Sequence, residues 1–374
     1  MRVYLDINAT TPVHPAVLDA LHEALAEVYG NASSIHKEGQ TARRRIEAAR
    51  ESVARLIGAT AREIVFTSGG TESNNATIFG AVTASGRHHI VTTALEHPSV
   101  REPVEELARR GHDVTFITPE RTGEVSARRM IEALRPDTRL LTMMLANNET
   151  GVIQPVAEVA AVCRQRGIHV HCDAVQAAGK IAVDVESLGV DSLAMSAHKL
   201  HAPKGIGALY VRKGLTLDSY ILGGAQERRR RAGTENVPLA IAFGVAADIA
   251  TDRADIAPLR DSLEDSLSSL SITINGKSVR RLPNTSNITF RGADAEGIVI
   301  GLDLNGVAVS TGSACSSGRV EPSRALLAMG LSSEEARSTV RFSLSRFTTA
   351  AEIERAVSLL REIVPRAQRA AATT

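Results

Sequence analysis

Short apolar runs alternate with amphipathic segments over about the first 255 residues of this chain of 374. Apolar residues recur at helical spacing in residues 15–28, 43–57, 100–109, 127–134 and 156–164. Short apolar runs predict strands at residues 90–92, 114–117, 140–145, 169–172, 193–195 and 208–211. This alternation predicts an α/β fold in which a mostly parallel sheet is sandwiched by helices.

The pattern changes after about residue 255. A helical segment at residues 259–270 precedes predicted strands at 272–274, 287–290 and 340–344, and a long helix runs from residue 350 to about 366. Grouping of this kind predicts a smaller α+β domain. We expect the Ala-rich tail from Ala367 to be frayed.

Two predicted strands lead into residues that suit one cofactor. Asp173 follows the strand at 169–172, and Lys199 closes Ser196-Ala197-His198-Lys199 after the strand at 193–195. Pyridoxal phosphate (PLP) needs a lysine amine for its Schiff base and a carboxylate that keeps its pyridine nitrogen protonated. Ser196 and His198 offer donors for the phosphate, and Gln176 can reach the ring hydroxyl. A lone lysine or aspartate is more often a solvated loop residue or turn former, but together with these neighbours the pair indicates a PLP enzyme.

Two further strand ends carry candidate residues. A predicted strand at 64–67 runs into a glycine turn and a helical pattern, so Gly70 and Thr71 are candidates for binding a phosphate through backbone N–H groups. His97 follows the strand at 90–92, where an imidazole could stack on the cofactor ring and move protons. Either feature alone is more often a plain turn or a surface histidine. Their place in one series of strand ends makes them candidates.

Cys315 differs from the other two cysteines. It lies in Ser313-Ala314-Cys315-Ser316-Ser317-Gly318, a stretch of small residues without apolar periodicity that predicts an exposed, mobile loop. Cys163 and Cys172 lie in a helical pattern and a strand, where a free cysteine packs as a small hydrophobe. Only Cys315 is placed as a nucleophile would be.

Charge and cysteine content narrow the setting. The formal net charge is +1, which gives no general case for binding nucleic acid or a membrane surface. The basic triplet at 43–45 is expected to be a solvated helix face, whereas the run at 228–231 is a candidate for a subunit interface or an acidic acceptor site. No apolar run reaches membrane-spanning length, and the start shows no basic segment followed by an apolar one. Together with three cysteines, this predicts a cytoplasmic protein.

The ordered motifs give the chain a family resemblance. It resembles the cysteine desulfurases of iron-sulfur-cluster assembly and nitrogen fixation, in the class V aminotransferase superfamily of fold type I PLP enzymes. The resemblance runs nearly end to end and rests on segments 4–12, 30–36, 68–75, 146–151, 173–176, 196–199, 231–234, 310–318 and 341–347, with His97. Ile7-Asn8 departs from many relatives, at positions without an expected catalytic role.

The resemblance implies roles for these residues. Lys199 would carry the Schiff base, His97 would be the stacked acid–base residue, and Cys315 would take sulfur from L-cysteine as a persulfide while alanine leaves. Asn148 and Arg341 would bind the substrate carboxylate, with Arg346 as the rival arginine. The resemblance further implies these contacts: Asp173 with the pyridinium, Gln176 with the ring hydroxyl, Gly70, Thr71, Ser196 and His198 with the phosphate, and Thr234 with the phosphate of the other subunit in a homodimer.

The resemblance also implies an organisation and a partner. The large PLP-binding domain would span residues 12–255, and the small domain would join residues 1–11 to 256–374 and carry the cysteine loop at about 310–322. A sulfur-acceptor protein, such as an iron-sulfur scaffold or another sulfur carrier, would receive the persulfide sulfur. No metal site is expected. A selenocysteine lyase or a PLP transaminase on the same fold remains an alternative, and a PLP-binding scaffold without activity is a remoter one.

Overall fold

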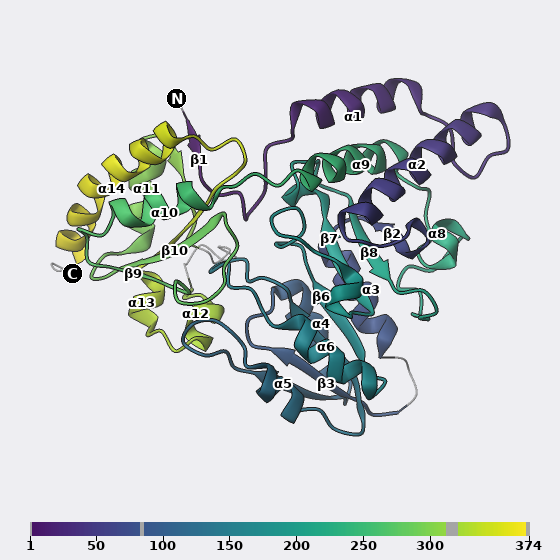
Figure 1. Ribbon diagram of the computed structural model, residues 1–374, viewed down its shortest axis with the longest axis horizontal. Helices are drawn as coiled ribbons and strands as arrows, with labels where there is room; N and C mark the ends of the chain where they lie inside the picture. Colours follow the sequence, from purple (N-terminus) through teal and green to yellow (C-terminus); the bar gives the residue numbers. More distant parts are fainter. Residues whose placement is uncertain (1, 83–85, 312–320, 372–374) are drawn as a thin grey trace.

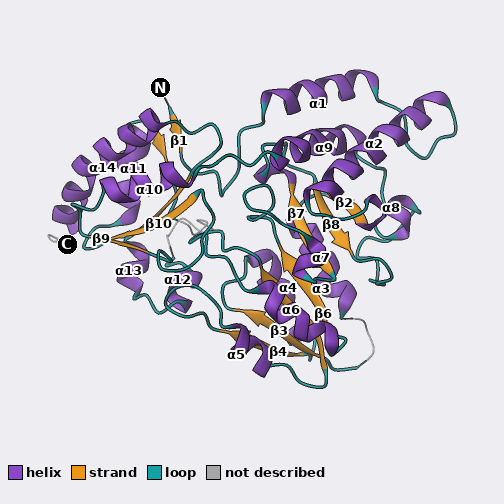
Figure 2. Cartoon of the chain, viewed as in Figure 1, coloured by secondary structure: helices purple, strands orange, loops and turns teal. Residues whose placement is uncertain are grey.

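The computed structural model describes residues 2–82, 86–311 and 321–371. Its largest sheet has the strand order β2-β8-β7-β6-β5-β3-β4. Figure 2 shows the strands in orange and the helices in purple. The pairs formed among β3, β4, β5, β6 and β7 are parallel, and β8 pairs antiparallel with both β7 and β2. The predicted mostly parallel sheet is therefore confirmed. Its strands are β2 Ile64–Thr67, β3 His89–Thr93, β4 Asp113–Ile117, β5 Thr138–Met144, β6 His169–Asp173, β7 Ser192–Ser196 and β8 Gly207–Val211.

Helices cover both faces of this sheet. Val91 and Leu141 belong to one hydrophobic cluster with residues of α1, α2, α5, α6 and α9, whereas their neighbours Ile90 and Leu140 pack with residues of α3 and α4. Successive side chains of a strand point to opposite faces, so both faces are buried. The elements are α1 Pro15–Glu27, α2 Lys37–Leu56, α3 Gly70–Ala81, α4 Pro98–Arg109, α5 Ala127–Glu132, α6 Val156–Gln165, α7 Val185–Leu188, α8 Gln226–Arg229, α9 Val237–Thr251 and the 3-10 turns η1 Ala61–Glu63 and η2 Ala197–Lys199.

The C-terminal part builds smaller sheets (Figure 1). Strands β12, β10 and β9 form an antiparallel sheet in that order, and β1 pairs parallel with β11. The elements are β1 Val3–Tyr4, β9 Ile272–Ile274, β10 Thr285–Phe290, β11 Val307–Ala308, β12 Thr339–Ser343, α10 Ala257–Ser266, α11 Ala295–Leu304, α12 Arg324–Ala328, α13 Ser333–Arg337 and α14 Ala350–Ala371. Helix α14 continues to Ala371, so the tail expected to fray from Ala367 is helical this far. Alanine is the strongest helix former, which accounts for the extension.

The N-terminal strand packs with the C-terminal elements. Val3 and Leu5 are fully buried in a hydrophobic cluster whose other members all come from residues 256–367. Figure 1 shows both chain ends in this part of the molecule. This cluster supports the proposed division into a domain of residues 12–255 and a second of residues 1–11 with 256–374. Residues of α12 and α13, such as Leu326, pack instead into the cluster of the large sheet.

Two kinds of feature are absent from the described residues. Among them, no helix combines the length and the apolar character needed to cross a bilayer. The same residues contain no group of histidine, cysteine and acidic side chains that could hold a metal ion.

Candidate active site

The strand ends bring the predicted residues to one edge of the sheet. Asp173 is the last residue of β6, Lys199 ends the 3-10 turn after β7, and His97 precedes α4 after β3. Gly70 begins α3 after β2, which runs in the same direction as β7 because each pairs antiparallel with β8. Ligands of open α/β sheets bind at this carboxyl edge.

Asp173 is buried and receives two hydrogen bonds. Its Oδ2 accepts from Nδ2 of Asn74 at 2.8 Å, and its Oδ1 accepts from the backbone N–H of Val175 at 2.9 Å. Both donors hold the carboxylate group in place, and a carboxylate is the partner that a protonated pyridine nitrogen requires. Asp173 thus fits the ring nitrogen of PLP.

Lys199 is prepared to react as an amine. Its Nζ donates to the backbone carbonyls of Asn8 and Ala9, the latter at 2.7 Å. Burial, and then the positive charge of Arg341, lower the pKa of Lys199 to about 8. A larger share of this lysine is therefore neutral near pH 7 than of an ordinary one, as Schiff-base formation needs.

The glycine turn at the start of α3 packs closely against its neighbours. A Cβ at Gly70 would lie 2.7 Å from Cγ2 of Val175, and the Cβ of Ser196 lies 3.6 Å from the same position. A Cβ at Gly207 would lie 2.6 Å from Cα of Gly69. Glycine therefore lets β8 approach the turn at the start of α3, where N–H groups and Ser196 can bind a phosphate.

His198 and Thr234 complete the predicted phosphate set. Nδ1 of His198 lies 3.2 Å from Oγ1 of Thr10, and burial lowers the pKa of His198 to about 4, so it is a neutral ring at physiological pH. Thr71 is exposed at the first turn of α3, and Thr234 is exposed between α8 and α9. The roles of these residues in cofactor binding stay predictions.

His97 has a defined tautomer. Its Nδ1 accepts from the backbone N–H of Ser99 at 3.1 Å, and Oγ of Ser99 lies 2.8 Å from the same nitrogen. A backbone N–H can only donate, so the proton of the neutral ring is on Nε2. Burial lowers the pKa of His97, which favours this neutral form.

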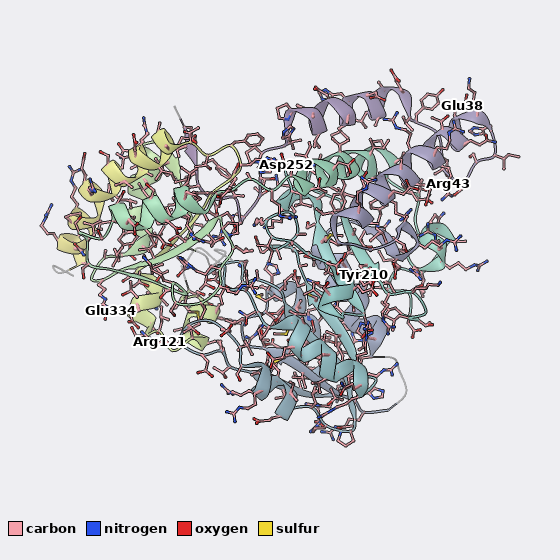
Figure 3. All side chains as sticks on the ribbon, in the orientation of Figure 1. Glu38, Arg43, Arg121, Tyr210, Asp252 and Glu334 are labelled. Atoms are coloured by element: carbon pink, nitrogen blue, oxygen red, sulfur yellow. The ribbon has the colours of Figure 1, made fainter. Side chains whose placement is uncertain are left out.

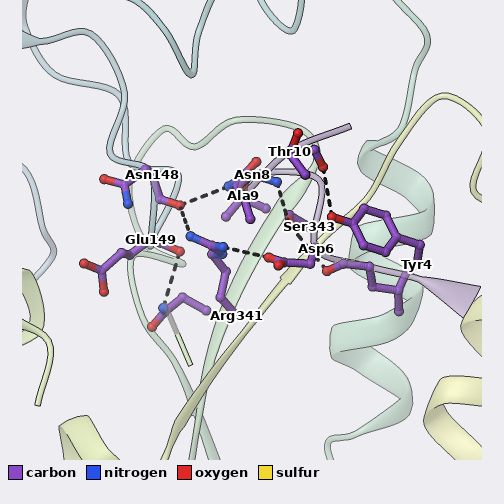
Figure 4. A network of polar contacts seen from close by, with 12 residues as sticks. Tyr4, Asp6, Asn8, Ala9, Thr10, Asn148, Glu149, Arg341 and Ser343 are labelled. Carbon is purple, nitrogen blue, oxygen red and sulfur yellow. Dashed lines mark hydrogen bonds and ion pairs between the residues drawn. The ribbon is translucent and has the colours of Figure 1, made fainter. Parts of the chain in front are cut away.

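The two candidate arginines have different surroundings. Arg341 donates to the carbonyl of Asn148 at 3.1 Å and to Oδ1 of Asp6 at 2.7 Å (Figure 4), and its buried Nε has no hydrogen-bond partner among the described residues. Arg346 instead donates to the carbonyls of Ile249 and of Asp252, which Figure 3 labels at the end of α9. Only Arg341 is bonded to the other predicted carboxylate-binding residue, Asn148.

Cys315 lies outside the described residues. The chain approaches that segment beside Arg341, because Ser310 forms a β-bridge with it, with an N–O distance of 2.6 Å from the Arg341 N–H to the Ser310 carbonyl. The other two cysteines are buried. Burial raises the pKa of Cys163 to about 12 and that of Cys172 well above its usual value, so neither thiol is activated.

Three polar residues that have no predicted role, Asn8, Lys180 and Asn74, form hydrogen bonds with predicted site residues or with one another. Asn8 accepts from Nε2 of Gln176 through its carbonyl and from Nζ of Lys180 through Oδ1, and Lys180 also donates to Oε1 of Gln176 at 2.7 Å. Burial, followed by the charges of Lys199 and Arg341, lowers the pKa of Lys180 well below its usual value. Asn74 is the third residue. The only sequence signal for them was their nearness in the chain to predicted site residues.

Comparisons with known proteins show what the chain as a whole is similar to. The model of the aminotransferase class-V family matches residues 3–356. A cysteine desulfurase from Nostoc sp. is 44% identical over 97% of this chain and 93% of its own length. The solved structure of a NifS-like protein has a TM-score of 0.91 at 35% identity, over 98% of this chain and all of that one. Another, titled SspA in complex with cysteine, has a TM-score of 0.85 at 36% identity, over 93% of this chain and all of that one.

Proposed function

Because the chain belongs to the class-V aminotransferase family and, within it, to the cysteine desulfurases, we propose that it converts L-cysteine to L-alanine and carries the released sulfur on Cys315. Family members are PLP-dependent enzymes, and the buried Asp173, the amine of Lys199 and the glycine turn fit that cofactor. The observation that carries the proposal is the meeting of Lys199, Asp173 and Arg341 where the chain enters the Cys315 segment.

The site residues Arg341, Lys199 and His97 each have a role in this reaction. PLP, when bound, withdraws electrons from the α-carbon of the amino acid substrate. Arg341 binds the substrate carboxylate together with Asn148, and its buried Nε, which has no hydrogen-bond partner among the described residues, supports this role. Lys199 would hold PLP through its amine and, once released, would move the α-proton of the substrate at Nζ. His97 presents its Nε2 proton on the side away from Ser99.

Cys315 completes the sulfur transfer. Its thiolate attacks the substrate sulfur, so the new S–S bond forms as the substrate C–S bond breaks. The electron pair of the broken bond stays with the carbon, which takes up a proton and becomes the methyl group of alanine. The sum is redox-neutral, and the persulfide sulfur then passes to an acceptor protein such as an iron-sulfur scaffold or another sulfur carrier.

The setting of the reaction is part of the proposal. We infer a homodimer in the cytoplasm, in which Thr234 contacts the cofactor phosphate of the partner subunit. The exposure of Thr234 between α8 and α9 supports a contact outside its own subunit. The free thiols of Cys163 and Cys172 support a reducing compartment.

Replacement of Cys315 by alanine tests the function. The Cys315→Ala variant should bind PLP and cysteine but release neither sulfide nor alanine. In the wild-type protein, mass spectrometry after one turnover should find the added sulfur on the peptide that contains Cys315. Cys163→Ala and Cys172→Ala are matched controls that should turn over and lose at most about 1–2 kcal/mol of stability. If Cys315→Ala turns over at the wild-type rate, the chain is a different PLP enzyme on this fold.

A further inference from the structure

Asn74 connects two site residues from inside α3. It is fully buried, and its Nδ2 donates to Oδ2 of Asp173 at 2.8 Å and to Oγ of Ser99 at 2.9 Å. Ser99 is the residue that fixes the tautomer of His97. An amide buried without hydrogen bonds lowers the stability of the folded protein. An apolar side chain of similar size would fill the same space without that cost, so packing alone does not require an amide here.

A chain of buried hydrogen bonds lies behind this amide. Oδ1 of Asn74 is 2.9 Å from Nε2 of His171, whose Nδ1 is 2.9 Å from Oγ of Ser192. The same Oγ is 2.8 Å from Nε2 of His169. His171 and Ser192 are fully buried, and His169 is 8% exposed.

The donor and acceptor roles along this chain follow from Asp173. Burial lowers the pKa of His171 to about 3, so its ring is neutral and has one N–H. An amide oxygen can only accept, so this N–H is on Nε2 and the Ser192 hydroxyl donates to Nδ1. Nε2–H of His169 then donates to Ser192. Every donor in the series points toward Asp173.

The opposite orientation of the amide is unfavourable. It would place Oδ1 of Asn74 2.8 Å from Oδ2 of Asp173, so that two oxygen acceptors faced each other. It would also require His171 to move its proton to Nδ1. The chain of hydrogen bonds therefore fixes which end of the amide faces Asp173.

We propose that Asn74, aligned by His171 and Ser192, is a positioning residue that holds the carboxylate of Asp173 turned toward the cofactor ring nitrogen. The inference deepens the proposed function and rests on it, because Asp173 acts only on bound PLP. Asn74 itself touches neither substrate nor cofactor in this role. The consequence is a measurable change in the protonation of the ring nitrogen.

The test is nitrogen NMR of the holoenzyme loaded with PLP that carries ¹⁵N in its ring. In Asn74→Leu, the ratio of protonated to unprotonated ring nitrogen should fall roughly tenfold or more, since a hydrogen bond to a charged group outweighs one pKa unit. Asn75→Ala is the matched control, because Asn75 is the next residue of α3 and donates to the carbonyls of Thr71 and Ser99. Its resonance should equal that of the wild type. A wild-type resonance in loaded Asn74→Leu overturns the inference and leaves the desulfurase proposal untouched.

A second pair of variants decides the matter if Asn74→Leu fails to fold. His171→Gln keeps an N–H donor near the position of Nε2, whereas His171→Leu removes it. The ring nitrogen should stay protonated in His171→Gln and lose protonation in His171→Leu. Equal spectra of these two variants contradict the proposed alignment. Failure of the wild-type protein itself to take up PLP would instead contradict the proposed function.

Discussion

Lys199 and Lys180 show how burial changes an amine before any cofactor arrives. Both lie next to Asn8, and burial is the largest cause of the lowered pKa of each. An ammonium ion loses its hydration when buried, so the neutral amine is favoured. Lys199 is thereby suited to attack an aldehyde, whereas Lys180 is engaged by side-chain oxygens of Asn8 and Gln176.

The pKa of Lys199 predicts the pH dependence of cofactor uptake. Only the neutral amine attacks PLP, and the pKa of about 8 lies below the usual value of 10.5. The initial rate of PLP uptake by the cofactor-free protein should therefore rise about tenfold per pH unit below pH 8 and level off above it. Stopped-flow absorbance measures this rate. A rate still rising steeply above pH 10 would show that burial does not act on Lys199 in this way.

Arg341 and Arg346 should differ in what they affect. Arg341→Gln should raise KM for cysteine at least tenfold, because the substrate carboxylate loses its charged partner near Asn148. Arg346→Gln should chiefly lower the thermal midpoint, because Arg346 donates to two backbone carbonyls at the end of α9. Steady-state kinetics and thermal denaturation of both variants separate these effects. The reverse pattern would make Arg346 the substrate clamp.

The sequence indicated those site residues that directly follow a predicted strand and are of a type that PLP chemistry requires. Asp173, Lys199 and His97 each follow a short apolar run, so their convergence could be expected from parallel strands. Asn74 and Asn8 could not be found in this way. Their importance depends on contacts with residues far apart in the chain, such as Asp173 for Asn74 and Thr285 for Asn8.

At the scale of elements, helices were predicted correctly where buried and exposed positions alternate regularly along the chain, and strands where short apolar runs mark them. The strands of the large sheet and helices such as α4 have clear patterns, and the expected ranges fall on them. Helix α9 was not predicted because Ala240, Ile241, Ala242 and Phe243 are all buried, so no polar face marks it. It packs against α1 and α2.

Helix α8 contains a strained left-handed run that should respond to glycine. Glu227, Arg228 and Arg229 have φ values of 43°, 57° and 64°, and non-glycine residues are unfavourable in that region. Arg229 is exposed. Arg229→Gly should therefore stabilise the protein by up to about 1 kcal/mol. Arg230→Gly is the control, because φ is −96° there and glycine should destabilise. Thermal denaturation of both variants decides, and a lower midpoint for Arg229→Gly contradicts the expectation.

Glu227 is held in this run by a buried ion pair. Its two carboxylate oxygens accept from Arg50 of α2 at 2.6 and 2.9 Å, and Oε2 also accepts from the backbone N–H of Phe66. A buried carboxylate with a bidentate partner cannot rotate freely toward solvent. The pair thus accounts for how the backbone of α8 keeps an unfavourable conformation.

At the scale of the molecule, the N-terminal segment crosses between the two hydrophobic clusters. Val3 and Leu5 belong to the C-terminal cluster, whereas Thr11 bonds to the carbonyl of His198 beside the large sheet. Asn8 lies midway, and its side chain bonds to Asn148 and Lys180 on one side and to Asn284 and Thr285 on the other. Its position predicts that Asn8 couples the two proposed domains.

Replacement of Asn8 tests this coupling. Asn8→Ala removes four side-chain hydrogen bonds, of which two are buried and two part-buried, at about 1 kcal/mol each, so the free energy of unfolding should fall by roughly 3–4 kcal/mol. If Asn8 joins the two domains, the calorimetric transition should also broaden or split, because each hydrophobic cluster then melts more independently. Asn305→Ala is a suitable control, since the exposed side chain of Asn305 donates only to the carbonyl of Gly301 in its own helix. A sharp Asn8→Ala transition at the midpoint of Asn305→Ala would mean that the two clusters unfold together without this residue.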